Sequence, residues 1–253
     1  MPLDRPLIAL PAHAPALLLH LTPGSQDAQV LPRVVFLHGY SACVRALSAR
    51  GQVPCGEGLP TREGWGLADA ADDSGRALAL LLPQLAFLRR DGDPGRLVEP
   101  GEARRLLEGA MRRGYAVSGR GTPPPGPWIL IAHSGGFTAA AAIAAHGELE
   151  LRAIVLLDAL YGAGPLFARW LTRNPRARLV SVHRPGGEPA RLTRLLARRL
   201  RRELGPAAVA KSSLDQLAVA LRDHRFVELQ VRTPHAQIPS RHLAALLRAL
   251  LPP

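Results

Sequence analysis

One short segment constrains the fold of this chain more than any other. Residues 128–132 form an apolar run that predicts a buried strand, and the alanine-rich residues 138–145 predict a closely packed helix. Ser134 lies at the turn between them, with small residues two positions before it (Ala132) and two positions after it (Gly136). Such a tight strand-to-helix turn has no room for bulky neighbours, and it presents the serine hydroxyl above the sheet. The pattern favours a nucleophile elbow over an ordinary turn in which Ser134 is only a helix N-cap.

Predicted strands and helices alternate along the rest of the chain. Near-continuous apolar strands between helices predict an α/β fold, with a mostly parallel sheet covered by helices on both faces. We interpret residues 31–253 as one domain and residues 1–30 as leading strands packed on it. Strands are predicted at 31–38, 76–83, 128–132, 152–157, 178–183 and 226–232, and helices at 67–71, 102–113 (closed by Gly114), 138–145, 188–204, 213–222 and 240–250 (with Ser240 as N-cap).

Composition excludes several classes of protein. No apolar run reaches the roughly 18 residues that a membrane span needs. The net charge of +12 suggests a nucleic-acid partner, but the basic residues are spread along the chain and nearly all are arginine, so we interpret the charge as background. The densest group lies on the predicted helix 188–204, whose leucines are expected inward and arginines outward: Leu192, Leu195, Leu196, Leu200 and Leu204 against Arg191, Arg194, Arg198, Arg199, Arg201 and Arg202.

The two cysteines, Cys43 and Cys55, fit no zinc-binding spacing. They are equally compatible with a disulfide and with two buried thiols. No signal peptide is recognised, which is typical of a cytoplasmic protein, whereas a disulfide would indicate an exported one whose signal has been removed. The compartment is therefore left open.

Candidate catalytic side chains follow the predicted strands. In an open parallel sheet, functional residues gather beyond the carboxyl ends of the strands, where this chain places His38, Ser134, Asp158, His183 and His235. A serine nucleophile needs a base, and the base needs a carboxylate to fix its tautomer. Ser134, Asp158 and His235 supply these groups in the order Ser…Asp…His. The natural oxyanion donors are the backbone N–H groups of the residues after Ser134 and after the His-Gly turn, Gly135 and Tyr40.

These residues resemble the α/β-hydrolase superfamily. The resemblance covers residues 31–251 and rests on the segments 34–40 (VVFLHGY) and 132–136 (AHSGG), with Asp158 and His235. It implies that Ser134 is the nucleophile, His235 the base and Asp158 the acid, with Tyr40 and Gly135 forming the oxyanion hole.

The position of the acid departs from the usual pattern. Most members carry it after the following strand, which here ends at His183, so Asp158 lies one strand earlier. Glu188 is the competing carboxylate, five residues beyond His183. We favour Asp158 because it directly ends its strand.

The remaining residues near the site have more than one interpretation. His38 and His133 are expected to hold neighbouring loops, and His183 is left open between a bystander, a supporting residue and a substrate contact. Segments 41–73 (with Trp65) and 84–101 are expected to border the substrate site. Tyr161, Phe167 and Trp170 form either one wall of it or the packing of a short helix.

The sequence predicts a serine hydrolase that cleaves carboxylic ester, thioester or amide bonds through an acyl-enzyme. No cofactor or metal is implied, and a small or acylated substrate is expected. The alternatives are a catalytically silent hydrolase-fold binding module, and a peptidase or acyltransferase with the same triad.

Overall fold

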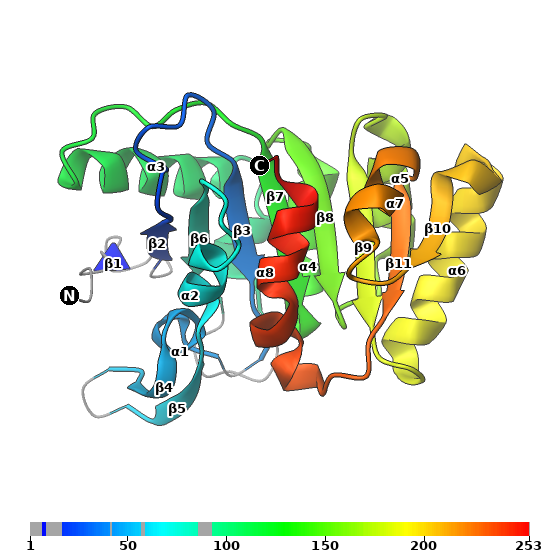
Figure 1. Ribbon diagram of the computed structural model, residues 1–253, viewed down its shortest axis with the longest axis horizontal. Helices are drawn as coiled ribbons and strands as arrows, with labels where there is room; N and C mark the ends of the chain where they lie inside the picture. The colour runs from blue at the N-terminus through cyan, green and yellow to red at the C-terminus, as the bar shows by residue number, and fades with distance from the viewer. Residues whose placement is uncertain (1–6, 9–16, 41, 57–58, 86–92, 253) are drawn as a thin grey trace.

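The computed structural model of the protein has a twisted central sheet with helices on both of its faces (Figure 1). It describes residues 7–8, 17–40, 42–56, 59–85 and 93–252. Within these residues the sheet has nine strands in the order β1-β2-β6-β3-β7-β8-β9-β11-β10. Their bounds are Leu7–Ile8 (β1), Leu17–Leu21 (β2), Arg33–Leu37 (β3), Ala79–Pro83 (β6), Trp128–His133 (β7), Leu151–Leu157 (β8), Arg178–His183 (β9), Val209–Ser212 (β10) and Phe226–Gln230 (β11).

The strands from β6 to β10 in this order all run parallel, and β2 and β1 add antiparallel strands at one edge. Parallel strands must be covered on both faces, and alternate side chains enter two separate cores. In β3, for example, Val35 and Leu37 join one core, whereas Val34 and Phe36 join the other. This arrangement confirms the predicted α/β class with a mostly parallel sheet.

Each face of the sheet is covered by its own set of helices. Buried residues of α3, α4, α5 and α6 form one core, and those of α1, α2, α7 and α8 form the other. No helix in the described part of the chain is long and apolar enough to cross a membrane. The helices span Val44–Ser48 (α1), Leu67–Asp72 (α2), Glu102–Val117 (α3), Phe137–His146 (α4), Gly164–Arg173 (α5), Gly187–Leu204 (α6), Leu217–Asp223 (α7) and Ile238–Leu250 (α8).

Two predicted helix ends are wrong. Gly114 does not close α3 but is buried inside it; the left-handed residue that follows the helix is Gly119, with φ of 70°. Ser240 does not cap α8, because the helix already begins at Ile238. Its hydroxyl donates instead to the carbonyl of Gln237 from within the first turn.

Elements without a strong apolar pattern were missed or misplaced by the prediction. The helix expected at 213–222 begins only at Leu217, and the short edge strand β10 precedes it with a single fully buried residue, Val209. The hairpin of β4 (Arg50–Pro54) and β5 (Thr61–Trp65) forms a separate two-stranded sheet with no buried position. Polar, exposed strands give no period-two signal, so the sequence pattern could not reveal them.

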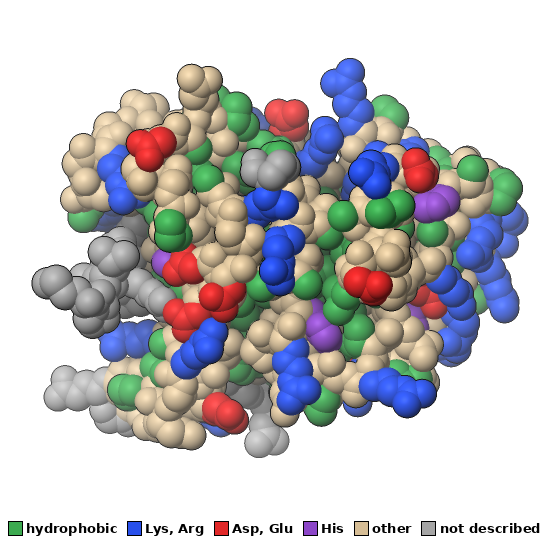
Figure 2. Space-filling view, in the orientation of Figure 1, with side chains coloured by type: hydrophobic (Ala, Val, Ile, Leu, Met, Phe, Trp, Pro, Cys, Tyr) green, Lys and Arg blue, Asp and Glu red, His purple; other side chains and the backbone are tan. Residues whose placement is uncertain are grey.

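Helix α6 carries its arginines on the outside, as predicted. Figure 2 shows a dense group of basic side chains along the edge of the molecule where α6 lies. Leu196 and Leu200 are buried beneath them, but Leu195, predicted inward, is 45% exposed. On the helix surface, Arg191 forms an ion pair with Glu188, and Arg199 forms one with Glu203.

Candidate active site

Ser134 occupies a strained turn between β7 and α4. Its φ of 53° is in the left-handed region, which a residue with a side chain rarely adopts. Among the described residues only three that are not glycine have a positive φ, and Asp158 (φ 45°) is another of them, Ala163 being the third. Such strain persists only where the surrounding structure enforces it, and it clusters at functional sites.

The small residues around Ser134 are required by close backbone contacts. A Cβ on Gly136 would lie 2.2 Å from the carbonyl oxygen of Leu37, so only glycine lets α4 begin against β3. Ala132, two residues before the serine, is fully buried. The chain therefore has no room for a side chain at Gly136, and Ala132 packs inside the core before the turn.

The loop after β3 lies directly against the serine. A Cβ on Gly39 would be 2.7 Å from Cβ of Ser134, 3.1 Å from its Oγ and 3.2 Å from the backbone nitrogen of Gly135. The next residue, Tyr40, lays its ring against Gly135, where a Cβ would meet ring carbon Cε1 at 2.5 Å. The structure thus brings together the two loops that carry the predicted oxyanion donors.

Asp158 and His235 are joined by a direct hydrogen bond between their side chains. Nδ1 of His235 donates to Oδ2 of Asp158 at 2.7 Å, across 77 residues of sequence. Arg184 also binds this carboxylate: its Nε lies 2.8 Å from Oδ2 and its backbone nitrogen 3.3 Å from Oδ1. Burial opposes ionisation of Asp158, but the hydrogen bonds from His235 and Arg184 outweigh it and lower the pKa of the carboxyl from 3.8 to about 2.

His133 holds the loop that carries His235. Its Nε2 donates to the carbonyl of His235 at 3.1 Å, and the two rings lie 4.5 Å apart between centroids. Trp65 packs edge-on against the ring of His133, with centroids 5.2 Å apart. Burial, reinforced by the neighbouring His235, lowers the pKa of His133 to about 3, so this ring stays neutral. No hydrogen bond joins the Ser134 hydroxyl to His235 among the described residues, and this contact is often loose before substrate binds.

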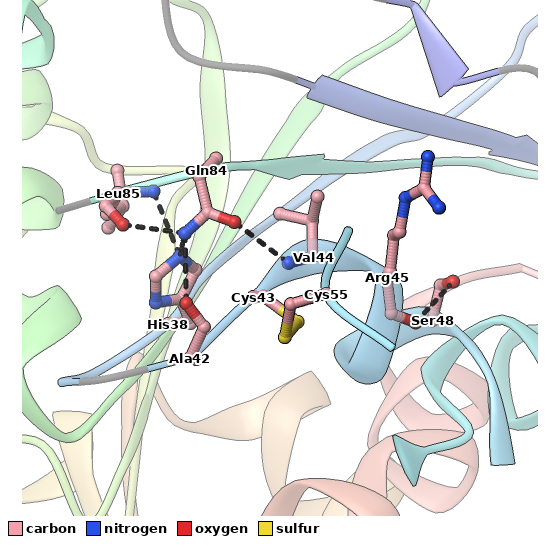
Figure 3. The surroundings of a disulfide bond; sticks show 9 residues. All are labelled: His38, Ala42, Cys43, Val44, Arg45, Ser48, Cys55, Gln84 and Leu85. Atoms are coloured by element: carbon pink, nitrogen blue, oxygen red, sulfur yellow. Dashed lines mark hydrogen bonds between the residues drawn. A yellow bond between two sulfur atoms is a disulfide. The ribbon is translucent and has the colours of Figure 1, made fainter. Parts of the chain in front are cut away.

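His38 and Gln84 fasten the loop after β3, as Figure 3 shows. Nδ1 of His38 donates to the carbonyl of Gly39 at 2.6 Å, and its Nε2 accepts from the backbone N–H of Leu85 at 2.9 Å. Gln84 accepts from the N–H of Val44 at 2.9 Å and donates to carbonyls on both sides, including that of Leu85 at 2.8 Å. Burial lowers the pKa of His38 to about 4, which keeps the ring neutral for these two roles. Both His38 and His133 therefore hold loops, as predicted.

Cys43 and Cys55 are paired in a disulfide (Figure 3), with sulfur atoms 2.11 Å apart. The bond joins the start of α1 to the end of β4 and so ties the hairpin to the loop next to the site. Of the two alternatives left open by the sequence, the structure contains the disulfide.

Among the described residues, no hydrogen bond joins the other candidates to Asp158 or His235. Glu188 is exposed on α6 and pairs with Arg191 at 2.5 Å. Phe167 and Trp170 are buried in the core, so they do not form a wall of the site; Tyr161 is 41% exposed. His183 is buried and does not face solvent. Parts of the two segments expected to border the site (residues 41, 57–58 and 86–92) lie outside the described residues.

Two residues of the site were missed by the sequence analysis: Arg184 and Gln84. Each directly follows the end of a parallel strand, β9 or β6, which is the same signal that identified the predicted residues. The described residues contain no group of three or more His, Cys, Asp or Glu side chains that could hold a metal ion.

Sheet order, helical layers and the position of Ser134 together define the α/β-hydrolase fold. Solved structures that resemble the chain are serine hydrolases and esterases of this fold. The feruloyl esterase module from Clostridium thermocellum matches with a TM-score of 0.59 and 9% identity, covering 99% of this chain and 88% of that one. S-formylglutathione hydrolase from Staphylococcus aureus matches with a TM-score of 0.53 and 13% identity, covering 97% of each chain.

A fluorophosphonate-binding serine hydrolase from Staphylococcus aureus matches with a TM-score of 0.53 and 11% identity, covering 98% of this chain and 99% of that one. No protein-family model and no curated protein sequence matches the chain. Identities this low show a shared fold and leave the activity to be argued from the site.

Proposed function

We propose that the protein is a serine hydrolase that cleaves carboxylic esters through a covalent acyl-enzyme. Ser134 is the nucleophile, His235 the general base and Asp158 the acid that orients it. The observation that carries this proposal is the 2.7 Å hydrogen bond from Nδ1 of His235 to a buried aspartate. It leaves Nε2 of the imidazole as the nitrogen that accepts a proton, in a site whose serine is held in a strained turn.

The reaction follows from these assignments. Oγ of Ser134 attacks the ester carbonyl while its proton passes to Nε2 of His235. The negative charge that forms on the carbonyl oxygen is stabilised by the backbone N–H groups of Tyr40 and Gly135. When the intermediate collapses, the alcohol leaves with the proton from His235. His235 then deprotonates a water molecule that attacks the acyl-enzyme, and it returns this proton to Oγ of Ser134 as the acid is released.

Asp158 remains ionised throughout the cycle. Its carboxyl has a pKa of about 2, so it stabilises the imidazolium that forms in each transition state without taking the proton. Glu188 was the alternative acid, but it is engaged by Arg191 on the surface of α6, whereas Asp158 contacts His235 directly.

Ester cleavage is the preferred reaction for two reasons. It is the least demanding chemistry for such a triad, and two of the similar structures carry esterase names. The thioester and amide reactions, and acyl transfer to an acceptor other than water, use the same residues. Rates on ester, thioester and amide substrates are therefore compared after the nucleophile has been tested.

The test is labelling with a fluorophosphonate probe, followed by intact-mass measurement and peptide mapping. We expect a single adduct on Ser134 in the wild type and none in S134A. The variant S240A is a matched control, because Ser240 is an exposed serine within α8, and it should label like the wild type. Absence of an adduct in folded wild-type protein would contradict the proposal and favour a catalytically silent binding module.

A further inference from the structure

We propose that Arg184 is a positioning residue for the Asp158–His235 pair, and that the buried pair of His183 and Glu228 holds Arg184 in place. This inference rests on the proposed function, because Arg184 acts through two residues assigned there to the triad. None of these three supporting residues takes part in the reaction steps described above.

Arg184 binds both oxygens of the Asp158 carboxylate. Its side chain reaches Oδ2 through Nε at 2.8 Å, and its backbone N–H reaches Oδ1 at 3.3 Å. The backbone N–H of Asp158 is itself anchored to the carbonyl of Val182 at 2.6 Å. With both oxygens held by one residue, the carboxylate cannot rotate without breaking a charge-assisted hydrogen bond. Oδ2 is thereby kept directed at Nδ1 of His235.

Arg184 follows the strand after which the resemblance places the acid. Resemblance to the superfamily places the acid of most members after the strand that corresponds to β9. In this chain the residue directly after β9 is an arginine, and the carboxylate it binds comes from the end of β8. A cation thus stands at the usual position of the acid and holds the acid of the neighbouring strand.

His183 and Glu228 fix the main chain of Arg184 from inside the sheet. Nδ1 of His183 lies 2.9 Å from the carbonyl oxygen of Arg184, and its Nε2 lies 3.1 Å from Oε1 of Glu228. A carbonyl oxygen and an ionised carboxylate only accept hydrogen bonds, so with Glu228 ionised both ring nitrogens of His183 donate, which favours the imidazolium form. Both side chains are buried on adjacent strands β9 and β11.

The electrostatic surroundings agree with this protonation state. Burial lowers the pKa of His183, but the hydrogen bond to Glu228 and the Arg184 carbonyl outweigh burial and raise the pKa above 6.5. The hydrogen bond from His183 lowers the pKa of Glu228. Lys211 on β10 approaches the same carboxylate oxygen at 3.7 Å. Loss of one partner of a buried charged pair is strongly destabilising. The pair of His183 and Glu228 therefore stays formed and holds the main chain of Arg184 in place.

The charge of Arg184 gives a signature that a purely structural role lacks. His235 faces three groups on neighbouring elements: the carboxylate of Asp158, the neutral ring of His133, and Arg184 beyond the shared oxygen. Removal of the guanidinium leaves the full carboxylate charge acting on the imidazole, which favours its protonated form. In the plot of kcat against pH, the rise on the acidic side (the acidic limb) then moves to higher pH.

The experiment compares R184Q and R184K with R191Q, a matched control that removes one exposed arginine from an ion pair outside the site. Steady-state rates on 4-nitrophenyl acetate and fluorophosphonate labelling rates are measured from about pH 5 to about pH 9. For R184Q we expect kcat to fall about tenfold with KM unchanged, and the acidic limb to rise by about half to one pH unit. R184K should restore the limb but only part of kcat, because an ammonium lacks the planar geometry of the guanidinium.

E228Q tests the supporting pair. It keeps the shape of the side chain but removes its charge. We expect kcat and the acidic limb of the pH profile to change in the same direction as in R184Q, but by less. R191Q should match the wild type, and melting temperatures verify that each variant is folded.

The outcomes separate this inference from the proposed function. If folded wild-type protein is not labelled at Ser134, the proposed function fails. If the wild type is labelled but R184Q keeps the rate and the pH profile of the wild type, only the role of Arg184 is refuted. A fall in kcat that tracks a loss of melting temperature, with no movement of the acidic limb, would also refute it.

Discussion

Replacement of Asp158 by asparagine separates the proposed acid from its rival. The change keeps the size of the side chain and removes its charge. Three donors face the two carboxylate oxygens: Nδ1 of His235 and the Nε and backbone nitrogen of Arg184. An amide offers a single oxygen, so at least one of these donors must face an NH₂ group.

The structure sets the size of the effect on stability. Burial raises the pKa of Asp158, but the three donors lower it by more, so the pKa falls from 3.8 to about 2. A shift of this size corresponds to about 2 kcal/mol of folding free energy. Because the folded pKa is the lower one, this stabilisation is present above pH 3.8 and is lost as the pH falls through 3.8 towards 2. D158N should therefore be less stable than the wild type by about 2 kcal/mol at neutral pH, and the difference should vanish in strong acid.

The assay pairs urea unfolding at several pH values with ester hydrolysis. D158N should lose roughly 10³–10⁴-fold in kcat, because the imidazole loses both its orienting acceptor and its stabilising charge. The matched control is E188Q, which removes an exposed carboxylate outside the cluster and should leave activity and melting temperature unchanged. A large loss of activity in E188Q, or near wild-type activity in D158N, would refute the assignment of the acid.

Three further outcomes are expected. The double variant C43S/C55S should lower the free energy of unfolding by at most about 3 kcal/mol, given the 12-residue separation of the cysteines; a larger loss in urea unfolding would contradict this local role. G39A should abolish fluorophosphonate labelling, because its Cβ would overlap the serine side chain, whereas G109A, where a Cβ meets nothing within 4 Å, should label normally. The stability difference between wild type and H183Q should shrink as the pH rises above neutrality, since the partners of His183 raise its pKa above 6.5 and the stabilisation is present below that value. A difference that does not vary with pH would contradict the charged state of that ring.

The sequence by itself determined the class of fold and the position of the turn at Ser134. Both depend on local patterns: apolar strands alternating with amphipathic helices, and small residues two positions on either side of the serine. Buried strands such as β7 and β9 were recognisable because all, or all but one, of their residues face a core. The polar hairpin and the edge strand β10 carry no such pattern and were not predicted.

The tertiary structure alone decided which side chains meet. The contact of His235 with Asp158, the pairing of the two cysteines and the position of Arg184 all depend on contacts between residues distant in sequence. Asp158 reaches Arg184 across 26 residues and His235 across 77, because β8, β9 and β11 are neighbours in the sheet and share one carboxyl edge. Strand order and register bring these groups within hydrogen-bonding distance, and neither is encoded in the local periodicity of the sequence.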